Sequence, residues 1–152
     1  MQENKVVAIT GAAGFIGSNF VHYMHQNYLS YRLIGIDNLG IGSSSGSLSG
    51  LAENFKFINA DIVDIGQILP LFKQEKVDYV VNFAAESHND RAIANPSPFA
   101  RTNAFGAQQI LEASRLSGVQ RHIHISTIEV YGEQGEQIPY FTETSPLNAN
   151  TP

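Results

Sequence analysis

Three glycines near the start of the chain have a spacing that could hold a phosphate group against bare backbone. Gly11, Gly14 and Gly17 follow the apolar run 6–9 and open a segment in which apolar residues recur at helical spacing. In such a strand–turn–helix, glycine lets a pyrophosphate approach the backbone, and the first helical turn offers unpaired N–H groups and a positive dipole end. The pattern predicts a dinucleotide-binding turn. No Gly-Lys-Ser/Thr follows it, which excludes a Walker-type phosphate loop.

A carboxylate stands where the ribose of a dinucleotide would need one. The second apolar run, residues 33–36, ends at Asp37, about twenty residues beyond the glycine turn. A carboxylate at this position can accept hydrogen bonds from both hydroxyls of an adenosine ribose, and it repels a 2′-phosphate. The sequence therefore favours NAD over NADP as the cofactor.

The composition of the chain excludes several classes of binding partner. The chain has 152 residues, a net charge of −5, nine lysines and arginines without a cluster, and no cysteine. A basic patch for nucleic acid or for an anionic membrane is therefore lacking, and no apolar stretch approaches the length of a membrane span. The amino terminus is too short and polar for a signal peptide, and the lack of cysteine rules out disulfides and thiolate chemistry. We expect small-molecule partners and a cytoplasmic location.

Short apolar runs alternate with segments of helical periodicity, which is typical of a parallel sheet covered by helices. The five expected strands cover residues 6–9, 33–36, 55–58, 79–83 and 122–125. We predict an α/β, Rossmann-type doubly wound parallel sheet in three layers, with strand order 3-2-1-4-5 and truncated after the fifth strand. Residues 1–152 are expected to form one NAD-binding domain, with the cofactor at the carboxyl edge of the sheet.

Apolar spacing also predicts which helical faces are buried. The predicted buried sets are Ile16, Phe20, Tyr23 and Met24 in a first helix, and Ile65, Ile68, Leu69 and Phe72 in a second. A third helix is expected over roughly residues 103–116, burying Ala107, Ile110 and Leu111, and Gly118 is placed to end it.

A stretch rich in glycine and serine covers residues 40–50, between the second and third expected strands. This composition buries little, so we predict a mobile loop. The loop is either a lid over the adenosine of the cofactor or a plain linker.

Three further segments carry a resemblance to a known family. They read Ala-Ala-Glu-Ser-His-Asn-Asp-Arg at 84–91, Ser-Thr-Ile-Glu-Val-Tyr-Gly at 126–132 and Phe-Thr-Glu-Thr at 141–144. With the glycine turn, they resemble the extended short-chain dehydrogenase/reductase family, and within it the nucleotide-sugar 4,6-dehydratases, over essentially the whole chain. The resemblance implies bound NAD and a nucleotide-sugar substrate of the dTDP-glucose type. It also implies oxidation at C4 of the hexose, loss of the C6 hydroxyl and return of the hydride to C6.

The resemblance assigns roles to individual residues. Glu129 would be the base that removes the C5 hydrogen, and the Thr127 hydroxyl would hydrogen-bond the C4 oxygen. The residues that would contact NAD are Gly11, Gly14, Phe15, Ile16, Gly17, Asp37, Asn38, Asp61, Ile62, Phe83, Ala84, Ala85, Ser87 and Thr102. Those that would contact the substrate are Ser87, together with His88 and Arg91 in an expected loop. We expect no metal site.

Four of these assignments have a structural alternative. Thr127 would merely terminate a strand, and Glu129 would be a solvated loop acid. Asp61 would bind the adenine amine, with Ile62 on the ring face, or it would cap the helix that follows, although Asp64 could itself be that cap. His88 would face the ligand or be a hydrogen-bonded structural histidine.

Four other polar residues are expected to have structural roles. His122 and His124 alternate with isoleucines, so both should point to one face of the fifth strand. Asn103 is expected at a helix start, where it would stabilise the site through backbone hydrogen bonds. Tyr131 is expected to pack against the turn that contains it.

The chain departs from the family pattern at two places. Ile128 occupies the position at which the family has the aspartic acid that protonates the departing hydroxyl, and a hydrocarbon cannot do this. The family's Tyr-x-x-x-Lys pair is also missing, because no tyrosine has a lysine four residues later and Lys76 is the last lysine. In the family that tyrosine takes the alcohol proton, and the lysine lowers its pKa.

These departures lead to three hypotheses. We expect an N-terminal fragment that ends just before the catalytic helix, binds NAD, is inactive alone and forms an altered version of the family's homodimer. A related epimerase or decarboxylase is an alternative, because oxidation at C4 needs no elimination acid. A non-catalytic NAD-binding module, or a partner whose open edge another chain completes, is the third.

Overall fold

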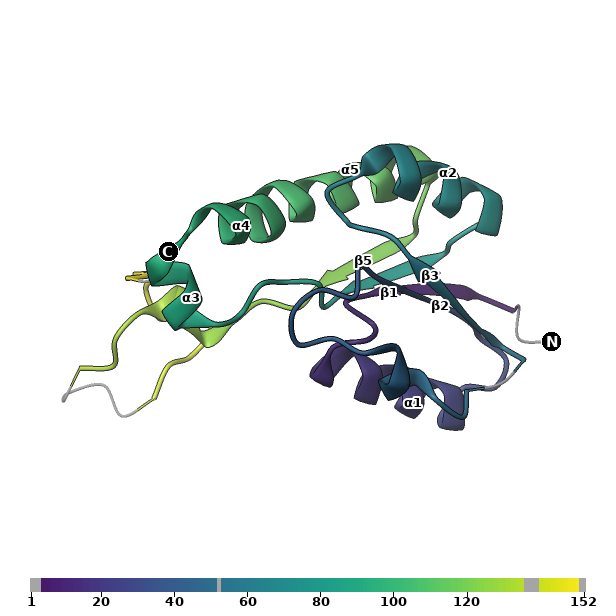
Figure 1. Cartoon of the computed structure of the whole chain (residues 1–152), viewed down its shortest axis with the longest axis horizontal. Coiled ribbons are helices and arrows are strands. Elements are labelled where there is room, and N and C mark those ends of the chain that lie inside the picture. The colour runs from purple at the N-terminus through teal and green to yellow at the C-terminus, as the bar shows by residue number, and fades with distance from the viewer. Residues whose placement is uncertain (1–3, 52, 136–139, 151–152) are drawn as a thin grey trace.

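The computed structural model describes residues 4–51, 53–135 and 140–150. Its centre is a parallel sheet whose strands lie in the order β3-β2-β1-β4-β5 (Figure 1). The strands are β1 (Val6–Thr10), β2 (Arg32–Asp37), β3 (Phe55–Asn59), β4 (Tyr79–Asn82) and β5 (Arg121–His124). The predicted strand order is confirmed, and no predicted strand end differs from the observed one by more than one residue. Thr151 and Pro152 lie outside the described residues.

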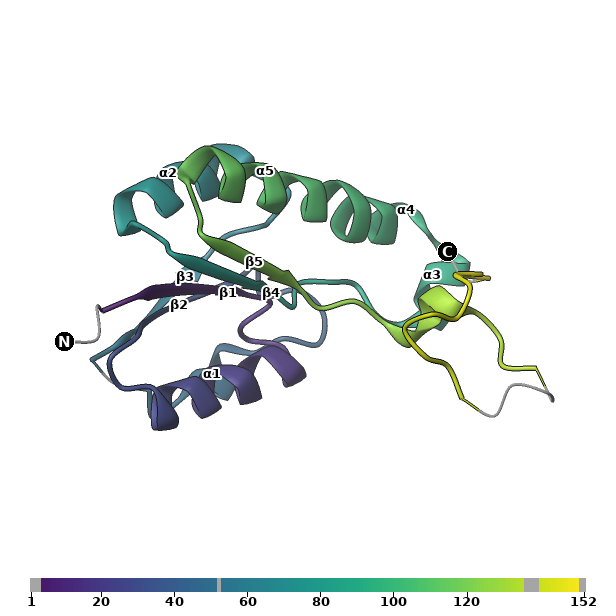
Figure 2. The same cartoon turned by 180° about the vertical axis from the view of Figure 1, so that it is seen from behind.

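Helices cover both faces of the sheet, as the doubly wound prediction requires (Figures 1 and 2). On one face lies α1 (Phe15–Asn27), and on the other lie α2 (Ile65–Glu75) and α5 (Ala107–Ser117). The remaining helices, α3 (Asn89–Ala94) and α4 (Ser97–Phe99), lie beyond the carboxyl ends of the strands. In the described part of the chain, no helix is long and apolar enough to span a membrane.

The alternation of side chains along β1 divides the core in two. Val6 and Ala8 belong to the cluster beneath α2 and α5, whereas Val7 and Ile9 belong to the cluster beneath α1. Every residue of β1 is buried, because successive side chains point to opposite faces and both faces are covered. This central strand therefore fixes the position at which the glycine turn begins.

The buried face of α1 differs in part from the prediction. Met24 is buried and Phe20 packs against the same core cluster as expected, but Ile16 and Tyr23 are 64% and 53% exposed. Gly17, Ser18 and Val21 are buried instead. A Cβ on Gly17 would lie 2.0 Å from the Gly11 carbonyl oxygen, so small residues must face the turn at this end of the helix. The requirement for close backbone contact overrides the apolar spacing.

The predicted face of α2 is confirmed, because Ile68 and Phe72 are buried and Ile65 and Leu69 pack against the same cluster. Asp64 is the residue that precedes this helix.

The third helix is longer than predicted and its face differs. The chain is helical from α4 through a π-helical stretch, Ala100–Gly106, into α5. Ile110 is buried as expected, but Leu111 is 49% exposed and Ala113 takes a core position instead. Within α5 the buried residues Ile110, Ala113 and Ser114 recur at ordinary helical spacing, and Leu111 lies to one side of that face. Gly118, with φ +74°, ends α5 as predicted.

The prediction of a mobile loop over residues 40–50 is wrong for its second half. Ser45–Leu48 forms a 3₁₀ helix, and Leu48 is buried in the core cluster beneath α1. The Ser44 N–H donates to the Ala13 carbonyl (3.0 Å), and the Ser47 carbonyl lies 2.9 Å from Nε2 of His22. One apolar side chain and these backbone contacts anchor a segment whose composition suggested no anchor.

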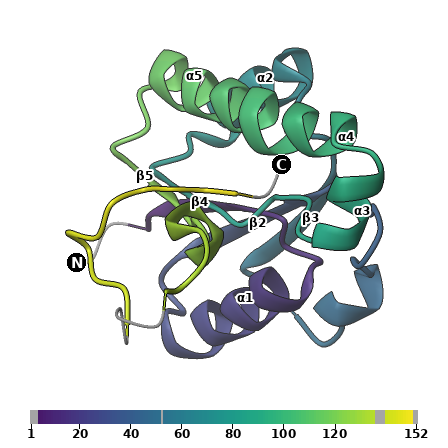
Figure 3. The ribbon, with the colours of Figure 1, turned by 90° about the vertical axis from the view of Figure 1, so that its left-hand side faces the viewer.

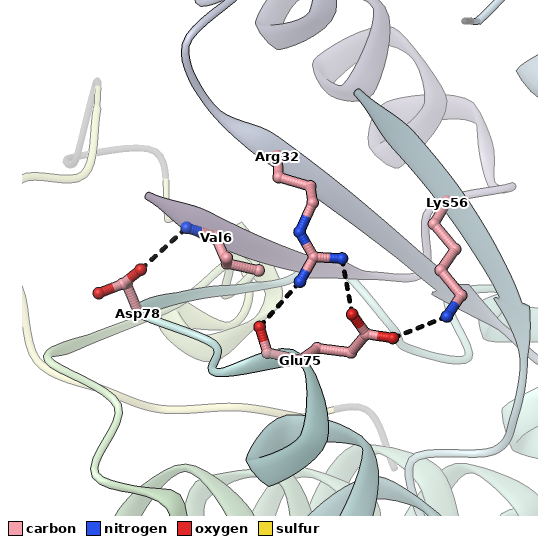
Figure 4. Close-up of polar contacts among 5 residues, drawn as sticks. All are labelled: Val6, Arg32, Lys56, Glu75 and Asp78. Atoms are coloured by element: carbon pink, nitrogen blue, oxygen red, sulfur yellow. Dashed lines mark hydrogen bonds and ion pairs between the residues drawn. The ribbon is translucent and has the colours of Figure 1, made fainter. Parts of the chain in front are cut away.

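Ion pairs hold the amino edge of the sheet (Figure 4). The Glu75 carboxylate, at the end of α2, accepts hydrogen bonds from Lys56 Nζ of β3 (2.7 Å) and from Arg32 Nη1 of β2 (2.6 Å). Arg32 Nη2 also donates to the Glu75 carbonyl (2.8 Å), and Asp78 accepts the Val6 N–H (2.9 Å). Hydrogen bonds from Lys56 and Arg32 hold the pKa of the Glu75 carboxyl below its ordinary value, against the opposing effect of burial.

We expect Glu75→Gln to lower the free energy of unfolding at pH 7 by about 1–2 kcal/mol, the range for charged hydrogen bonds whose cations stay partly solvated. Because the Glu75 pKa is lower in the folded chain, the wild-type advantage is present above the ordinary glutamate pKa and is lost as the pH falls through the lowered value. Urea unfolding of both chains from pH 7 downward measures the difference.

Glu112→Gln is the matched control, because Glu112 pairs with Arg115 one turn along the outer side of α5. This substitution should change the free energy of unfolding less than Glu75→Gln. Equal stability of Glu75→Gln and wild type at pH 7 would contradict a structural role for the Glu75 network.

Candidate functional site

A cavity of about 700 Å³ opens at the carboxyl ends of the strands. Figure 3 shows the molecule from this end, with α1 on one side of the sheet and α2 and α5 on the other. The cavity walls come from the glycine turn and from the segments that follow β2, β3, β4 and β5. Ligands of open parallel sheets bind at this edge, next to the strand where the order reverses, which here is β1.

The glycine turn lets the backbone after β1 lie very close to the backbone that follows β4. Gly11 has φ +67°, and a Cβ there would lie 2.7 Å from the Ala84 nitrogen at the end of β4. The Gly14 N–H donates to the Gly11 carbonyl (3.2 Å), and Gly14 in turn accepts the Ser18 N–H (2.9 Å) as α1 begins. Gly11, Gly14 and Gly17, as well as Phe15 and Ile16, all line the cavity, so this predicted set lies together.

Asp37 joins the end of β2 to this turn. Its Oδ2 accepts the Ala13 N–H (3.0 Å) and its Oδ1 accepts the Leu39 N–H (2.8 Å), which orients the carboxylate at the cavity. Each carboxylate oxygen has a further lone pair, so the group can still accept hydrogen bonds from a ligand. Asp37 and the neighbouring Asn38 both line the cavity, as predicted.

The segment after β3 provides Asp61 and Ile62 to the cavity wall. Asp61 Oδ1 accepts the Val63 N–H (3.1 Å), so this carboxylate shapes its own turn. Of the two alternatives for Asp61, the helix cap is excluded, because Asp64 is the residue that precedes α2 and its carbonyl accepts the Ile68 N–H.

The segment after β4 contributes most of the expected contacts. Phe83, Ala84, Ala85, Ser87 and His88 line the cavity, and so does Thr102 of the π-helical stretch.

Asn103 holds this segment in place through both atoms of its amide. Its Oδ1 accepts the Glu86 N–H and its Nδ2 donates to the Glu86 carbonyl, each at 2.8 Å. The expected role of Asn103 through backbone hydrogen bonds is confirmed, although it lies within the π-helical stretch and not at a helix start.

Arg91 is the one expected site residue that does not line the cavity. It lies in α3, not in a loop, with Nη1 3.0 Å from Glu86 Oε2 and its guanidinium 5.9 Å from the centre of the Phe99 ring. An acid and an aromatic ring next to this cation keep it beside the cavity wall. Its contact with substrate stays a prediction.

Thr127 and Glu129 both reach the cavity after β5. The Thr127 Oγ1 accepts the Glu129 N–H (3.3 Å), and the two residues begin a 3₁₀ helix, Ile128–Tyr131. Ile128 is 67% exposed and does not line the cavity. Tyr131 stacks on Phe141 with ring centres 5.0 Å apart, so it packs against a later segment of the chain, and its expected packing against its own turn stays a prediction.

Several lining residues were not among those assigned to the site from the sequence, although the lid alternative for the 40–50 loop places residues 40–43 beside the cofactor. These lining residues are Ile36, Gly40, Ile41, Gly42, Ser43, Ala60, Glu86, Asn89, Ala92, Phe99, Asn103, His124, Ile125 and Ser126. A Cβ on Gly42 would lie 3.9 Å from His88 Cε1, so the loop after β2 and the segment after β4 approach each other at the cavity. The glycine-rich composition of the loop was the available signal for this contact. For His124, alternation with isoleucine suggested only a strand face.

Comparisons with known proteins agree with this geometry. The model of the NAD dependent epimerase/dehydratase family matches residues 7–152. The dTDP-glucose 4,6-dehydratase of Mycolicibacterium smegmatis is 40% identical over 145 residues, which cover 95% of this chain and 43% of the relative.

Solved structures show the same likeness. A dTDP-glucose 4,6-dehydratase from Streptomyces venezuelae with NAD bound has a TM-score of 0.88 at 36% identity, over 96% of this chain and 46% of that one. A UDP-Glc/GlcNAc 4-epimerase from Campylobacter jejuni has a TM-score of 0.88 at 31% identity, over 97% and 44%. The chain thus spans less than half the length of these relatives. On the match over residues 7–152, the chain belongs to the NAD dependent epimerase/dehydratase family.

Proposed function

We propose that the cavity binds NAD with its diphosphate over the glycine turn. The adenosine would lie toward Asp37, Asp61 and Ile62, and the nicotinamide half toward the ends of β4 and β5. The observation that carries this proposal is one continuous cavity that joins the Gly11–Gly17 turn to both groups of residues. The family's use of NAD, and the NAD bound in the Streptomyces venezuelae structure, support it.

We propose further that the chain is the NAD-binding part of a nucleotide-sugar 4,6-dehydratase. Bound NAD would supply an acceptor for the C4 hydride of the sugar, and the alcohol proton would go to the family's tyrosine, which this chain lacks. Beside a carbonyl at C4, Glu129 would take the C5 proton, and the Thr127 hydroxyl would donate to the carbonyl oxygen. Ser87 and His88 border the cavity near the sugar, whereas Arg91 would act from beside it. The identities to dTDP-glucose 4,6-dehydratases support a substrate of this type.

A sugar-nucleotide 4-epimerase is the second candidate. Elimination needs an acid beside Glu129, and the neighbouring position holds Ile128, which is exposed to solvent and outside the cavity wall. Epimerisation through oxidation at C4 needs no such acid. The likeness to the Campylobacter jejuni 4-epimerase supports this candidate.

The homodimer implied by the resemblance and the cytoplasmic location also stay proposals.

NAD should bind with clear preference over NADP, because the buried Asp37 carboxylate would repel a 2′-phosphate. Asp37→Asn keeps a carbonyl acceptor but loses the charge, so we expect about 10- to 100-fold weaker NAD binding and a smaller preference over NADP. Calorimetry with both cofactors measures these values. Asp64→Asn is the control, because it changes an acid outside the cavity at the same edge of the sheet. Unchanged NAD affinity in Asp37→Asn would contradict the assigned orientation of the cofactor.

The chain should not turn over dTDP-glucose in the presence of NAD, because no tyrosine with a lysine four residues later is available to take the alcohol proton. Mass spectrometry of the sugar nucleotide after incubation is the measurement, with the Mycolicibacterium smegmatis dehydratase as positive control. A 4-keto-6-deoxy product at a rate near that of the control would overturn this expectation. Appearance of the C4 epimer would favour the second candidate.

A further inference from the structure

A row of three polar side chains crosses the sheet at its carboxyl edge. Thr10 of β1 is in register with Asn82 of β4, and Asn82 is in register with His124 of β5. Asn82 is fully buried and hydrogen-bonds to both neighbours. The row leads from the central strand, where the glycine turn begins, to a histidine on the cavity wall.

The hydrogen bonds of Asn82 fix the orientation of its amide. The Ala84 N–H donates to Asn82 Oδ1 (3.2 Å), and the Thr10 hydroxyl donates to the same oxygen. A backbone N–H can only donate, so Oδ1 must be the atom that faces Ala84. The NH₂ group of Asn82 therefore points the other way, toward His124.

This orientation determines the tautomer of His124. Asn82 Nδ2 lies 2.9 Å from His124 Nδ1, and since Nδ2 can only donate, Nδ1 must accept. The proton of the neutral imidazole is then on Nε2. Within the described part of the chain, Nε2 of His124 has no hydrogen-bond partner, although the residue borders the cavity.

His122, two residues earlier on the same strand face, provides the contrast. The Ser114 hydroxyl donates to the Ile110 carbonyl (2.7 Å), so it must accept from Nδ1 of His122, which lies 3.0 Å away. His122 thus has its proton on Nδ1, and its Nε2 is buried without a partner among the described residues. Burial, and secondarily the charge of His124, lower the pKa of His122. His122 packs inside the fold, whereas His124 presents an unused N–H donor at the cavity.

We propose that His124 donates its Nε2–H to an oxygen acceptor in the second nucleotide of the bound cofactor, on the side away from adenosine. The inference rests on the NAD site proposed above. With the diphosphate over the turn after β1, the adenosine half lies toward β2 and β3, and the other half must lie toward β4 and β5. His124, at the end of β5 and three residues before Thr127, borders that half. Asn82 is a positioning residue, because it acts only by fixing the tautomer of His124.

Two variants distinguish loss of the Nε2 donor of His124 from disruption of its hydrogen bond to Asn82. In His124→Asn, the shorter amide can still meet Asn82 but cannot reach the cavity as Nε2 does. In His124→Gln, the amide nitrogen extends to about the position of Nε2 and restores a donor. We expect the Kd for NAD to rise about 3- to 10-fold in His124→Asn, and to stay within about twofold of wild type in His124→Gln. The Kd for ADP, which lacks the second nucleoside, should stay unchanged in both.

Calorimetry with NAD and ADP as probes tests whether His124 contacts the second nucleotide of the cofactor. An unchanged Kd for NAD in His124→Asn, with normal wild-type binding, overturns the role of His124 and leaves the NAD site intact. Failure of the wild-type chain to bind either probe overturns the NAD site itself.

Nitrogen-15 NMR of the unliganded wild-type chain tests the tautomer without any variant. We expect His124 to show a protonated Nε2 and an unprotonated Nδ1, and His122 to show the reverse. A protonated Nδ1 on neutral His124 would overturn the inference, however the variants fold.

Discussion

The structure depends on three stretches of backbone that meet without side chains between them. Gly11 lies against the backbone that leaves β4, and Gly17, in the first turn of α1, lies against the Gly11 carbonyl. A side chain at either position would force the first strand, the first helix and the fourth strand apart. Because β1 is buried on both faces, the strand cannot move to make room. The same absence of side chains leaves N–H groups open to a ligand, so packing and binding share one requirement.

The amino and carboxyl ends of the strands, on either side of this contact, have different roles. The amino edge is fixed by ion pairs of Glu75 with Arg32 and Lys56, and they tie α2 to two strands. The carboxyl edge has loops, short helices and a cavity, and its polar groups are oriented by the backbone, as Asp37 is by the N–H groups of Ala13 and Leu39. The Glu75 network stabilises the fold far from the groups that would meet a ligand.

The sequence was sufficient for those features that depend on local patterns. Apolar runs located all five strands, and the glycine turn with Asp37 located the centre of the cavity. Spacing failed where a specific backbone or side-chain contact decides the outcome: Gly17 must face the glycine turn where Ile16 was expected to be buried, and Leu48 anchors a loop of glycine and serine. The sequence placed His124 only on a strand face, because its hydrogen-bond partner Asn82 lies forty-two residues away along the chain. Arg91 could not be placed from sequence either, since its partners Glu86 and Phe99 come together only through α3.

The π-helical stretch Ala100–Gly106 has a consequence for how the chain can vary in length. A π-helical turn holds about one residue more than an α-helical turn, so losing one residue from this stretch would leave a continuous α-helix. Ile110 and Ala113 of α5 would keep their core positions. The shortening should therefore be tolerated here, whereas a one-residue deletion inside α5 would rotate the rest of that helix by about 100° and take core residues away from the sheet.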